Sequence, residues 1–206
     1  MPGSAMKKLP ASFYRREDVL QISRELLGKL LVTEWDGVRT SGRIVECEAY
    51  AGVFDRASHA AGGKRTRRNE VMYHHGGLAY VYLCYGIHHL FNVVTNVRNV
   101  PHAVLIRALE PVSGIDTMLD RSRREKMDHS LTRGPGNLSR ALGIHTQHSG
   151  LSLRGTGLYI ADDGFGFADS AIARSARIGV EYAGVDAALP YRFYVKGNPF
   201  VSGRPK

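Results

Sequence analysis

The 206-residue sequence has little of what disulfide-rich or membrane-spanning proteins need. It contains two cysteines, Cys47 and Cys84, without CxxC spacing, which argues against a disulfide scaffold. Both lie in apolar stretches, and we interpret them as reduced core residues. The longest apolar run, Leu78 to Ile87, is about ten residues, whereas a membrane-spanning helix needs roughly 18. Because the sequence also lacks a secretory signal, we expect a cytoplasmic protein with no membrane partner.

Acidic side chains are scarce relative to basic ones: 19 Asp and Glu oppose 28 Lys and Arg, for a net charge of +9. Arginines outnumber lysines three to one. Because the planar guanidinium group suits phosphate, this composition favours nucleic acid or another polyanion as a partner. A protein that is merely basic is the alternative.

Two basic segments, 64–68 and 121–126, are candidates for contacts to a phosphate backbone. The Gly134-Pro135-Gly136 turn is predicted to open a short helix, whose free N–H groups could bind another phosphate. A solvated surface and an ordinary helix start are the respective alternatives. The candidate backbone contacts from the first segment and the turn are Lys64, Arg65, Arg67, Arg68, Gly134 and Gly136.

The element pattern predicts an α+β fold, with a curved, mainly antiparallel sheet, a protruding β-hairpin and flanking helices. Residues 1–5 resemble a cloning scar before a second start at Met6, so we expect one domain over residues 6–206. Asp36-Gly37 and Gly86 predict two hairpins. Ser113 and Asp116 predict a capping box at a helix start. The predicted ranges are a helix over 17–29 and strands over 30–35, 43–50, 78–85, 88–95, 103–109 (ended by Pro111), 157–160, 176–180 and 191–195.

The predicted strand over 43–50 carries two glutamates. Period-two alternation places Glu46, Glu48 and Tyr50 on one face with Ile44, and small apolar residues on the other. Because carboxylates are mostly exposed, two solvated glutamates are the simpler interpretation of this segment alone. The alternative is a glutamate beside Tyr50 in a cleft, where it acts as a general base.

Tyr85 lies next to Gly86 at the predicted tip of the second hairpin. A large aromatic side chain at a hairpin tip is exposed unless it packs on something. In a basic protein it could be inserted between stacked bases, as base-flipping and architectural proteins do. The alternative is a ring that lies on its own sheet, and the pattern does not decide between the two.

The histidines include two adjacent pairs, His74-His75 and His88-His89. Adjacent residues in a strand point to opposite faces, so neither pair readily chelates one ion. HExxH spacing is also missing. We therefore expect no metal site and no cofactor.

Several short segments follow one another in an order that identifies a family. They are Arg43-Ile44-Val45-Glu46-Cys47-Glu48-Ala49-Tyr50, Ser58-His59, Arg67-Arg68-Asn69, Tyr80-Val81-Tyr82-Leu83-Cys84-Tyr85-Gly86, Asn92, Val104-Leu105-Ile106-Arg107-Ala108-Leu109-Glu110-Pro111, Arg133-Gly134-Pro135, Arg177-Ile178-Gly179-Val180 and Arg192-Phe193-Tyr194-Val195. Together they span nearly the whole chain. In residues and order they resemble the alkyladenine (3-methyladenine) DNA glycosylase family.

The resemblance implies a single domain with a curved antiparallel sheet, and hydrolytic removal of damaged purines from double-stranded DNA. Such purines include 3-methyladenine, 7-methylguanine, hypoxanthine and ethenoadenine. The expected enzyme is a monofunctional glycosylase that flips the damaged nucleotide out of the duplex and leaves an abasic site. We expect it to act as a monomer.

Residue roles follow from the same resemblance. It implies that Glu48 is the catalytic base, that Arg107 lies beside the attacking water, and that the backbone of Val180 also holds this water. Tyr85 matches the residue that fills the gap left by the flipped nucleotide. The aromatic walls of the base pocket are expected to be Tyr50, His59 and Tyr82. Asn92 is expected to crowd the 2-amino group of normal guanine.

The sequence departs from the family next to Tyr85, the residue expected to fill the gap, because Ile87, His88 and His89 follow Tyr85-Gly86. It also departs at Asn137, where some relatives have a lysine or a similar contact. Two other functions stay open. One is a nucleic-acid-binding module on the same scaffold without catalysis. The other is a metal-dependent hydrolase that uses the histidines, which a chelator would inactivate.

Overall fold

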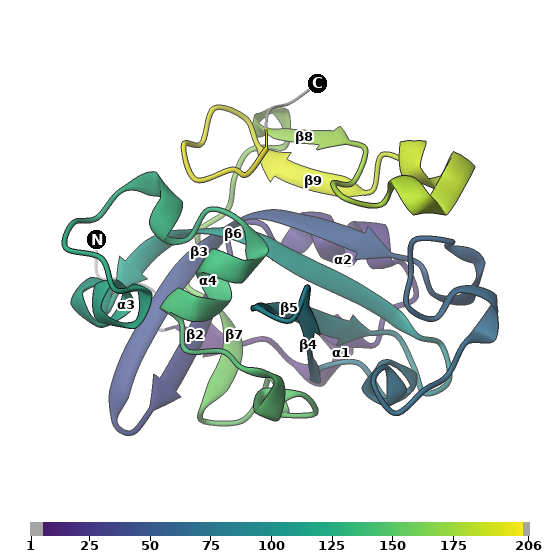
Figure 1. Ribbon diagram of the computed structural model, residues 1–206, viewed down its shortest axis with the longest axis horizontal. Helices are drawn as coiled ribbons and strands as arrows, with labels where there is room; N and C mark the ends of the chain where they lie inside the picture. Colours follow the sequence, from purple (N-terminus) through teal and green to yellow (C-terminus); the bar gives the residue numbers. More distant parts are fainter. Residues whose placement is uncertain (1–5, 204–206) are drawn as a thin grey trace.

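The computed structural model describes residues 6–203, which form one antiparallel sheet flanked by short helices (Figure 1). The helices are α1 (Ala11–Tyr14), α2 (Val19–Leu26), α3 (Ile115–Ser122) and α4 (Pro135–Ala141). The strands are β1 (Lys7–Lys8), β2 (Leu30–Trp35), β3 (Val38–Tyr50), β4 (Ala79–Cys84), β5 (His88–Thr95), β6 (His102–Ser113), β7 (Leu158–Asp162), β8 (Ile172–Ser175) and β9 (Arg192–Val195). The predicted α+β class is confirmed. No helix in residues 6–203 has the length and apolar composition that crossing a bilayer requires.

The strand order is β1-β7-β2-β3-β6-β5-β4, and β8 and β9 join the sheet through β3. β3 is the central strand and changes its partner along its length. Residues 38–43 pair with β2, whereas residues 46–48 pair with β9, and β6 follows β3 along its other edge. This exchange brings the C-terminal strands β8 and β9 next to the second half of β3 (Figure 1).

Both predicted hairpins are present. Asp36 and Gly37 have φ values of 53° and 79°, and Tyr85 and Gly86 have values of 50° and 73°. Two consecutive left-handed residues are the signature of the tight turn whose twist matches that of paired strands. The second hairpin therefore places Tyr85 at its tip, where 92% of the residue is exposed.

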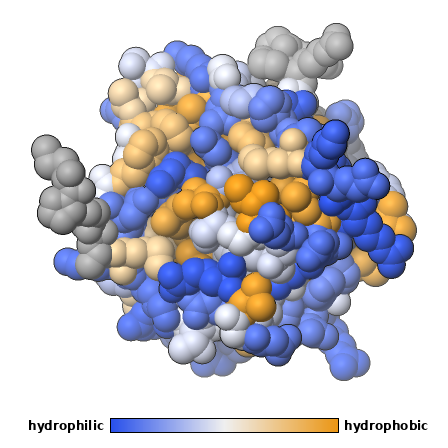
Figure 2. Space-filling view, turned by 90° about the vertical axis from the view of Figure 1, so that its left-hand side faces the viewer, coloured by the Kyte–Doolittle hydropathy of each residue, from blue (hydrophilic) through white to orange (hydrophobic). Residues whose placement is uncertain are grey.

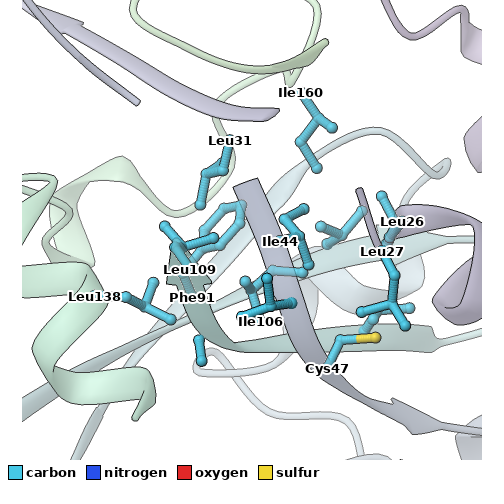
Figure 3. Close-up of a cluster of buried hydrophobic side chains, with 14 of the residues drawn as sticks. Leu26, Leu27, Leu31, Ile44, Cys47, Phe91, Ile106, Leu109, Leu138 and Ile160 are labelled. Carbon is cyan, nitrogen blue, oxygen red and sulfur yellow. The ribbon is translucent and has the colours of Figure 1, made fainter. Parts of the chain in front are cut away.

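A β-bulge reorganises the glutamate strand. In the ladder between β3 and β6, Ile44 pairs with Leu109 and Glu46 with Ala108, so Val45 has no partner. The prediction that Ile44 shares the face of the glutamates is wrong, because Ile44 lies with Cys47 in the main hydrophobic cluster (Figure 3). A second irregularity follows directly, between Glu46–Ala108 and Cys47–Ile106, and leaves Arg107 outside the ladder. Bulges re-aim side chains, and here they direct Arg107 toward both glutamates.

The main core joins elements from most of the chain. α2 packs on β3 and β6, and α4 packs on β5 and β6. Figure 3 shows the resulting cluster of buried side chains, which includes Leu26, Leu27, Leu31, Ile44, Cys47, Phe91, Ile106, Leu109, Leu138 and Ile160. Cys47 is buried as predicted, whereas Cys84 is only half-buried, so its prediction as a core residue is wrong.

Two helix starts differ from the prediction. The helix predicted over 17–29 is shorter, because Asp18 caps it by accepting hydrogen bonds from the N–H groups of Leu20 and Gln21. The predicted capping box at Ser113 is wrong. Gly114, with a φ of 72°, is the N-cap of α3, and the Ser113 hydroxyl instead bonds to that of Ser41 on β3.

Two strand predictions also fail. Pro111 does not end its strand, since β6 continues to Ser113 and Pro111 pairs with Gly42 beside another register shift. Residues 176–180 form no strand. They follow β8 as an irregular segment. Arg177 donates a hydrogen bond to Asp55 in the loop after β3, and the N–H of Ile178 donates one to Glu48 on β3.

Large apolar side chains are exposed at several places on the surface. The strongest cases lie on η1 (Gly52–Phe54), on the β4–β5 turn and on η7 (Glu181–Ala188), and they are Phe54, Tyr85, Ile87, Tyr182 and Val185. On the face at the left of Figure 1, in contrast, hydrophilic and hydrophobic residues are interleaved (Figure 2).

The irregular segment 176–180 is fixed by a buried ion pair. Arg177 Nη1 and Nη2 lie 2.5 and 2.8 Å from the two Asp55 oxygens, and Asp55 also accepts hydrogen bonds from the N–H groups of Ala51 and Ala57. The Arg43–Asp163 pair has the same two-pronged geometry but is partly exposed. Loss of one partner from a buried pair leaves an uncompensated charge, whereas water screens an exposed one.

We therefore expect Asp55→Ala to lower the free energy of unfolding by about 3–5 kcal/mol. Asp163→Ala, its matched control, is expected to cost about 1 kcal/mol or less. Urea denaturation followed by circular dichroism measures both. Equal losses for the two variants would show that burial of the Arg177–Asp55 pair does not anchor this segment.

Candidate active site

Glu48 is fully buried in the second half of β3, and three groups bind its carboxylate. Tyr50 Oη donates a hydrogen bond to Oε2 at 2.9 Å, and the N–H of Ile178 donates to Oε1 at 2.8 Å. Arg107 Nη1 lies 3.3 Å from Oε1. Burial and the nearby Glu48 charge raise the pKa of Tyr50 well above its usual range, so Tyr50 stays protonated and can donate.

Glu46 is equally buried but has different partners. Its Oε1 accepts hydrogen bonds from Arg107 Nε at 3.0 Å, Arg192 Nε at 2.7 Å and Ser202 Oγ at 3.0 Å. Its Oε2 accepts one from the N–H of Ser202 at 2.6 Å. The interpretation of the strand as carrying two solvated glutamates is therefore wrong, because β6, β9 and the C-terminal segment enclose both carboxylates.

A cavity open to solvent lies next to Tyr50, the hydrogen-bond partner of Glu48. All four residues expected to form the base pocket line it, together with residues from η3 (Glu70–Tyr73), β4, β6 and η7. The lining residues are Tyr50, Ala57, His59, Met72, Tyr80, Tyr82, Asn92, Ala103 and Tyr182. Since most of these side chains are aromatic or apolar, the cavity suits a planar heterocycle.

The histidine of this cavity is held in one orientation. His59 Nδ1 and Tyr80 Oη are 2.7 Å apart, and the His59 ring meets the Tyr82 ring edge-on with centroids 4.6 Å apart. Burial lowers the pKa of His59 to about 4, and the positive charges of Arg68 and Lys64 act in the same direction. His59 is therefore an uncharged wall at neutral pH.

Two arginines stack on tyrosines of the cavity without lining it. The Arg177 guanidinium lies 4.8 Å from the Tyr50 ring centroid, and that of Arg68 lies 4.9 Å from the Tyr82 centroid. These cation–π contacts occupy one face of each ring.

Asn92, on β5, is fixed by its amide group. Its Nδ2 donates to the carbonyls of Tyr80 and Leu90 at 3.1 and 3.3 Å. The side chain therefore cannot swing away from a ligand without losing both hydrogen bonds. It forms a rigid wall of the cavity.

Val180 lies at the start of η7, two residues after Ile178. It is buried against Ala57, and its carbonyl accepts a hydrogen bond from the N–H of Ala183 at 2.9 Å. The direct backbone contact to the Glu48 carboxylate comes from Ile178, a residue of the Arg177-Ile178-Gly179-Val180 motif to which the family resemblance assigned no role.

The four expected phosphate contacts of the basic loop are exposed but differ in their surroundings. Arg65 pairs with Glu70 at 2.5 Å, so its charge is already partly neutralised. Arg68 stacks on Tyr82. No ion pair within residues 6–203 involves Lys64 or Arg67.

The two glycines at the start of α4 have local reasons to be glycine. Gly134 is the N-cap, with a φ of 92° that favours glycine. Gly136 lies so close to β5 that an added Cβ would be 2.8 Å from His88 Nδ1. The structure thus brings this helix start next to the protruding hairpin.

Sequence reasoning missed several cavity residues. Tyr80 belongs to the quoted Tyr-rich segment, and its alternation with Tyr82 placed both on one face, but no role was assigned to it. Met72 and Tyr182 carry no local signal. Tyr182 reaches the cavity because its hydroxyl donates to the carbonyl of Ala57, 125 residues earlier in the chain.

Comparison with known proteins agrees with the resemblance. Residues 12–199 match the model of the family described as methylpurine-DNA glycosylase. A Chlamydia felis protein is 46% identical over 186 residues, which cover 90% of this chain and 94% of that protein. A protein of Bacillus cereus strain G9842 is 47% identical over 202 residues, covering 94% and 98%. Both are named "Putative 3-methyladenine DNA glycosylase". The chain belongs to the methylpurine-DNA glycosylase family.

Proposed function

We propose that this DNA-repair glycosylase flips damaged purines, alkylated or deaminated, out of double-stranded DNA and hydrolyses the N-glycosidic bond with a water activated by Glu48. One observation carries the proposal: a fully buried carboxylate, bonded by Tyr50, Ile178 and Arg107, shares Tyr50 with an aromatic cavity. The names of the Chlamydia felis and Bacillus cereus relatives, which refer to a 3-methyladenine DNA glycosylase, support the proposed substrate class.

The proposed reaction needs a general base, a pocket for the flipped purine and a side chain that fills the gap in the duplex. A base stacked in the duplex shields C1′ from attack, so the nucleotide must be extruded, and Tyr85 at the hairpin tip is suited to fill the gap. The flipped purine would enter the cavity between Tyr50, His59 and Tyr82. Glu48 would take a proton from the attacking water while the water oxygen forms a bond to C1′. The N-glycosidic bond would break, and the purine would leave with its electron pair.

Arg107 and the backbone near Val180 complete the proposed water site. The attacking water must touch both Glu48 and C1′, and Arg107 Nη1 already lies beside Glu48. Among residues 6–203, no lysine contacts Glu48, so we propose a water nucleophile and an intact abasic strand. We propose that the reaction uses no cofactor. The contacts to the DNA phosphate backbone that are proposed for Lys64, Arg67, Arg68 and the start of α4 would hold the duplex on either side of the lesion.

A binding module without catalysis is the competing function. Such a module needs the basic loop and the hairpin but not a carboxylate buried at a cavity. Release of free base from duplex DNA that carries one defined lesion, tested across several lesions, separates the two functions. Binding without any base release would favour the module.

The first prediction concerns the base. Glu48→Gln should keep lesion-DNA binding and lose roughly 10²-fold or more in single-turnover base release, because the amide cannot accept the water proton. Glu17→Gln, which changes an exposed carboxylate just before α2, is the control and should keep the wild-type rate. Near-wild-type excision by Glu48→Gln would remove this assignment.

The second prediction concerns the hairpin tip. Tyr85→Ser should weaken affinity for lesion duplex, because no ring would remain to fill the gap in the stack. A lesion in a single strand, or opposite a gap, should be affected less. Ile87→Ser removes a neighbouring exposed apolar side chain and serves as the control in the same titrations. Equal losses on all substrates would count against a wedge.

The third prediction concerns selectivity. Because Asn92 is locked by two hydrogen bonds, it should clash with the 2-amino group of normal guanine. Asn92→Ser should raise the rate of guanine excision relative to hypoxanthine excision. Competition assays with the two bases in one duplex context measure this ratio, and an unchanged ratio would place selectivity elsewhere in the pocket.

A further inference from the structure

A buried polar cluster lies next to Glu48, and Arg107 is its only member with a place in the reaction proposed above. It consists of Glu46 on β3, Arg107 on β6, Arg192 on β9 and Ser202 in the C-terminal segment 198–203. Glu46 is enclosed and accepts four hydrogen bonds from the other three residues. It therefore has no free oxygen with which to act as a second base.

The cluster determines how the Arg107 guanidinium is oriented. Nε donates to Glu46 at 3.0 Å, and Nη2 donates to Ser202 Oγ at 3.2 Å. These two nitrogens form one edge of the planar fork, so both bonds together prevent rotation of the group. The remaining nitrogen, Nη1, is the one that faces Glu48.

Ser202 closes this arrangement from the far end of the chain. Its hydroxyl accepts from Arg107 and donates to Glu46, so it bridges the arginine and the carboxylate. Its backbone is held separately, because its N–H donates to Glu46 Oε2 and its carbonyl accepts from Arg192 Nη2 at 2.5 Å. Asn198 adds a hydrogen bond to Glu110 on β6.

We propose that Ser202, together with Glu46, is a positioning residue for catalysis, and that the C-terminal segment is thereby part of the active site. It holds the Nε–Nη2 edge of Arg107 so that Nη1 stays directed at Glu48 and the attacking water. The inference rests on the proposed hydrolytic function, and it adds a group that touches neither water nor DNA. Its action goes entirely through Arg107.

Ser202→Ala is the sharpest test, because it removes only the hydroxyl and leaves both backbone bonds of residue 202 in place. Ser23→Ala is the matched control. Ser23 is also buried, and its hydroxyl donates to the carbonyl of Val19 within α2, remote in the sequence from this cluster. Circular dichroism at the assay temperature checks that both variants are folded.

Kinetics give the first readout. Ser202→Ala should slow single-turnover base release roughly tenfold or more, with unchanged lesion-DNA affinity, because a misdirected catalytic group costs rate rather than binding. Ser23→Ala should match wild type. In an Arg107→Gln background, Ser202→Ala should cause no further loss of rate, because the arginine that Ser202 positions is absent. A full additional loss in that background, or a wild-type rate for Ser202→Ala alone, would overturn the inference.

Nuclear magnetic resonance gives a readout that needs no activity. The Arg107 Nε–H signal should exchange slowly with solvent in wild type and in Ser23→Ala, and clearly faster in Ser202→Ala. An unchanged signal in Ser202→Ala would refute the positioning role even if the rate fell. If the wild-type protein released no base from any lesion, the proposed function would fail, while this measurement would still decide whether Ser202 fixes Arg107.

Discussion

Two carboxylates buried side by side on β3 set the arrangement of the C-terminal part of the chain. A buried charge must be paired and hydrogen-bonded, or it would be neutralised or would unfold the protein. Glu48 is paired by an N–H group 130 residues downstream, and Glu46 by one 156 residues downstream. Segment 176–180, strand β9 and residues 198–203 therefore close over the same half of β3. The exchange of strand partners on β3 after residue 43 makes room for this closure, because β2 leaves the edge that β9 then occupies.

Features encoded by adjacent residues could be predicted from the sequence, and features that depend on distant partners could not. The strand 30–35 and both hairpins were correct, because Asp36-Gly37 and Tyr85-Gly86 select their turn locally. Alternation placed Glu46 and Glu48 on one face, but it could not say that β9 and residue 202 would cover that face. Segment 176–180 has strand-like composition, yet its backbone bonds to side chains instead of a neighbouring strand. The pocket residues came from the family resemblance, and Tyr182 was missed because only tertiary contacts bring it to the cavity.

The cavity walls combine aromatic faces with little free charge. His59 is uncharged at neutral pH, and Tyr50 and Tyr82 each carry an arginine on one face. A cation already placed on an aromatic ring lowers the attraction of that ring for a second cation on the other face. These tyrosines therefore attract a cation less than bare tyrosines would, and they still offer stacking area to a neutral ring. The Asn92 side chain, which two hydrogen bonds fix, adds a wall of constant shape.

Charge balance explains why one arginine is shared between two carboxylates. Before the proposed reaction, Glu46 and Glu48 oppose Arg107 and Arg192, so the buried cluster is neutral. When Glu48 takes the proton of water, it stops compensating Arg107. A buried guanidinium that lost its sole partner would be costly at that moment and would raise the barrier. Arg107 keeps Glu46 and Ser202 on its other edge throughout, so its charge stays compensated while Nη1 stays directed at Glu48. Glu46 therefore stabilises the arginine in both protonation states of the base, which a single Arg107–Glu48 pair could not do.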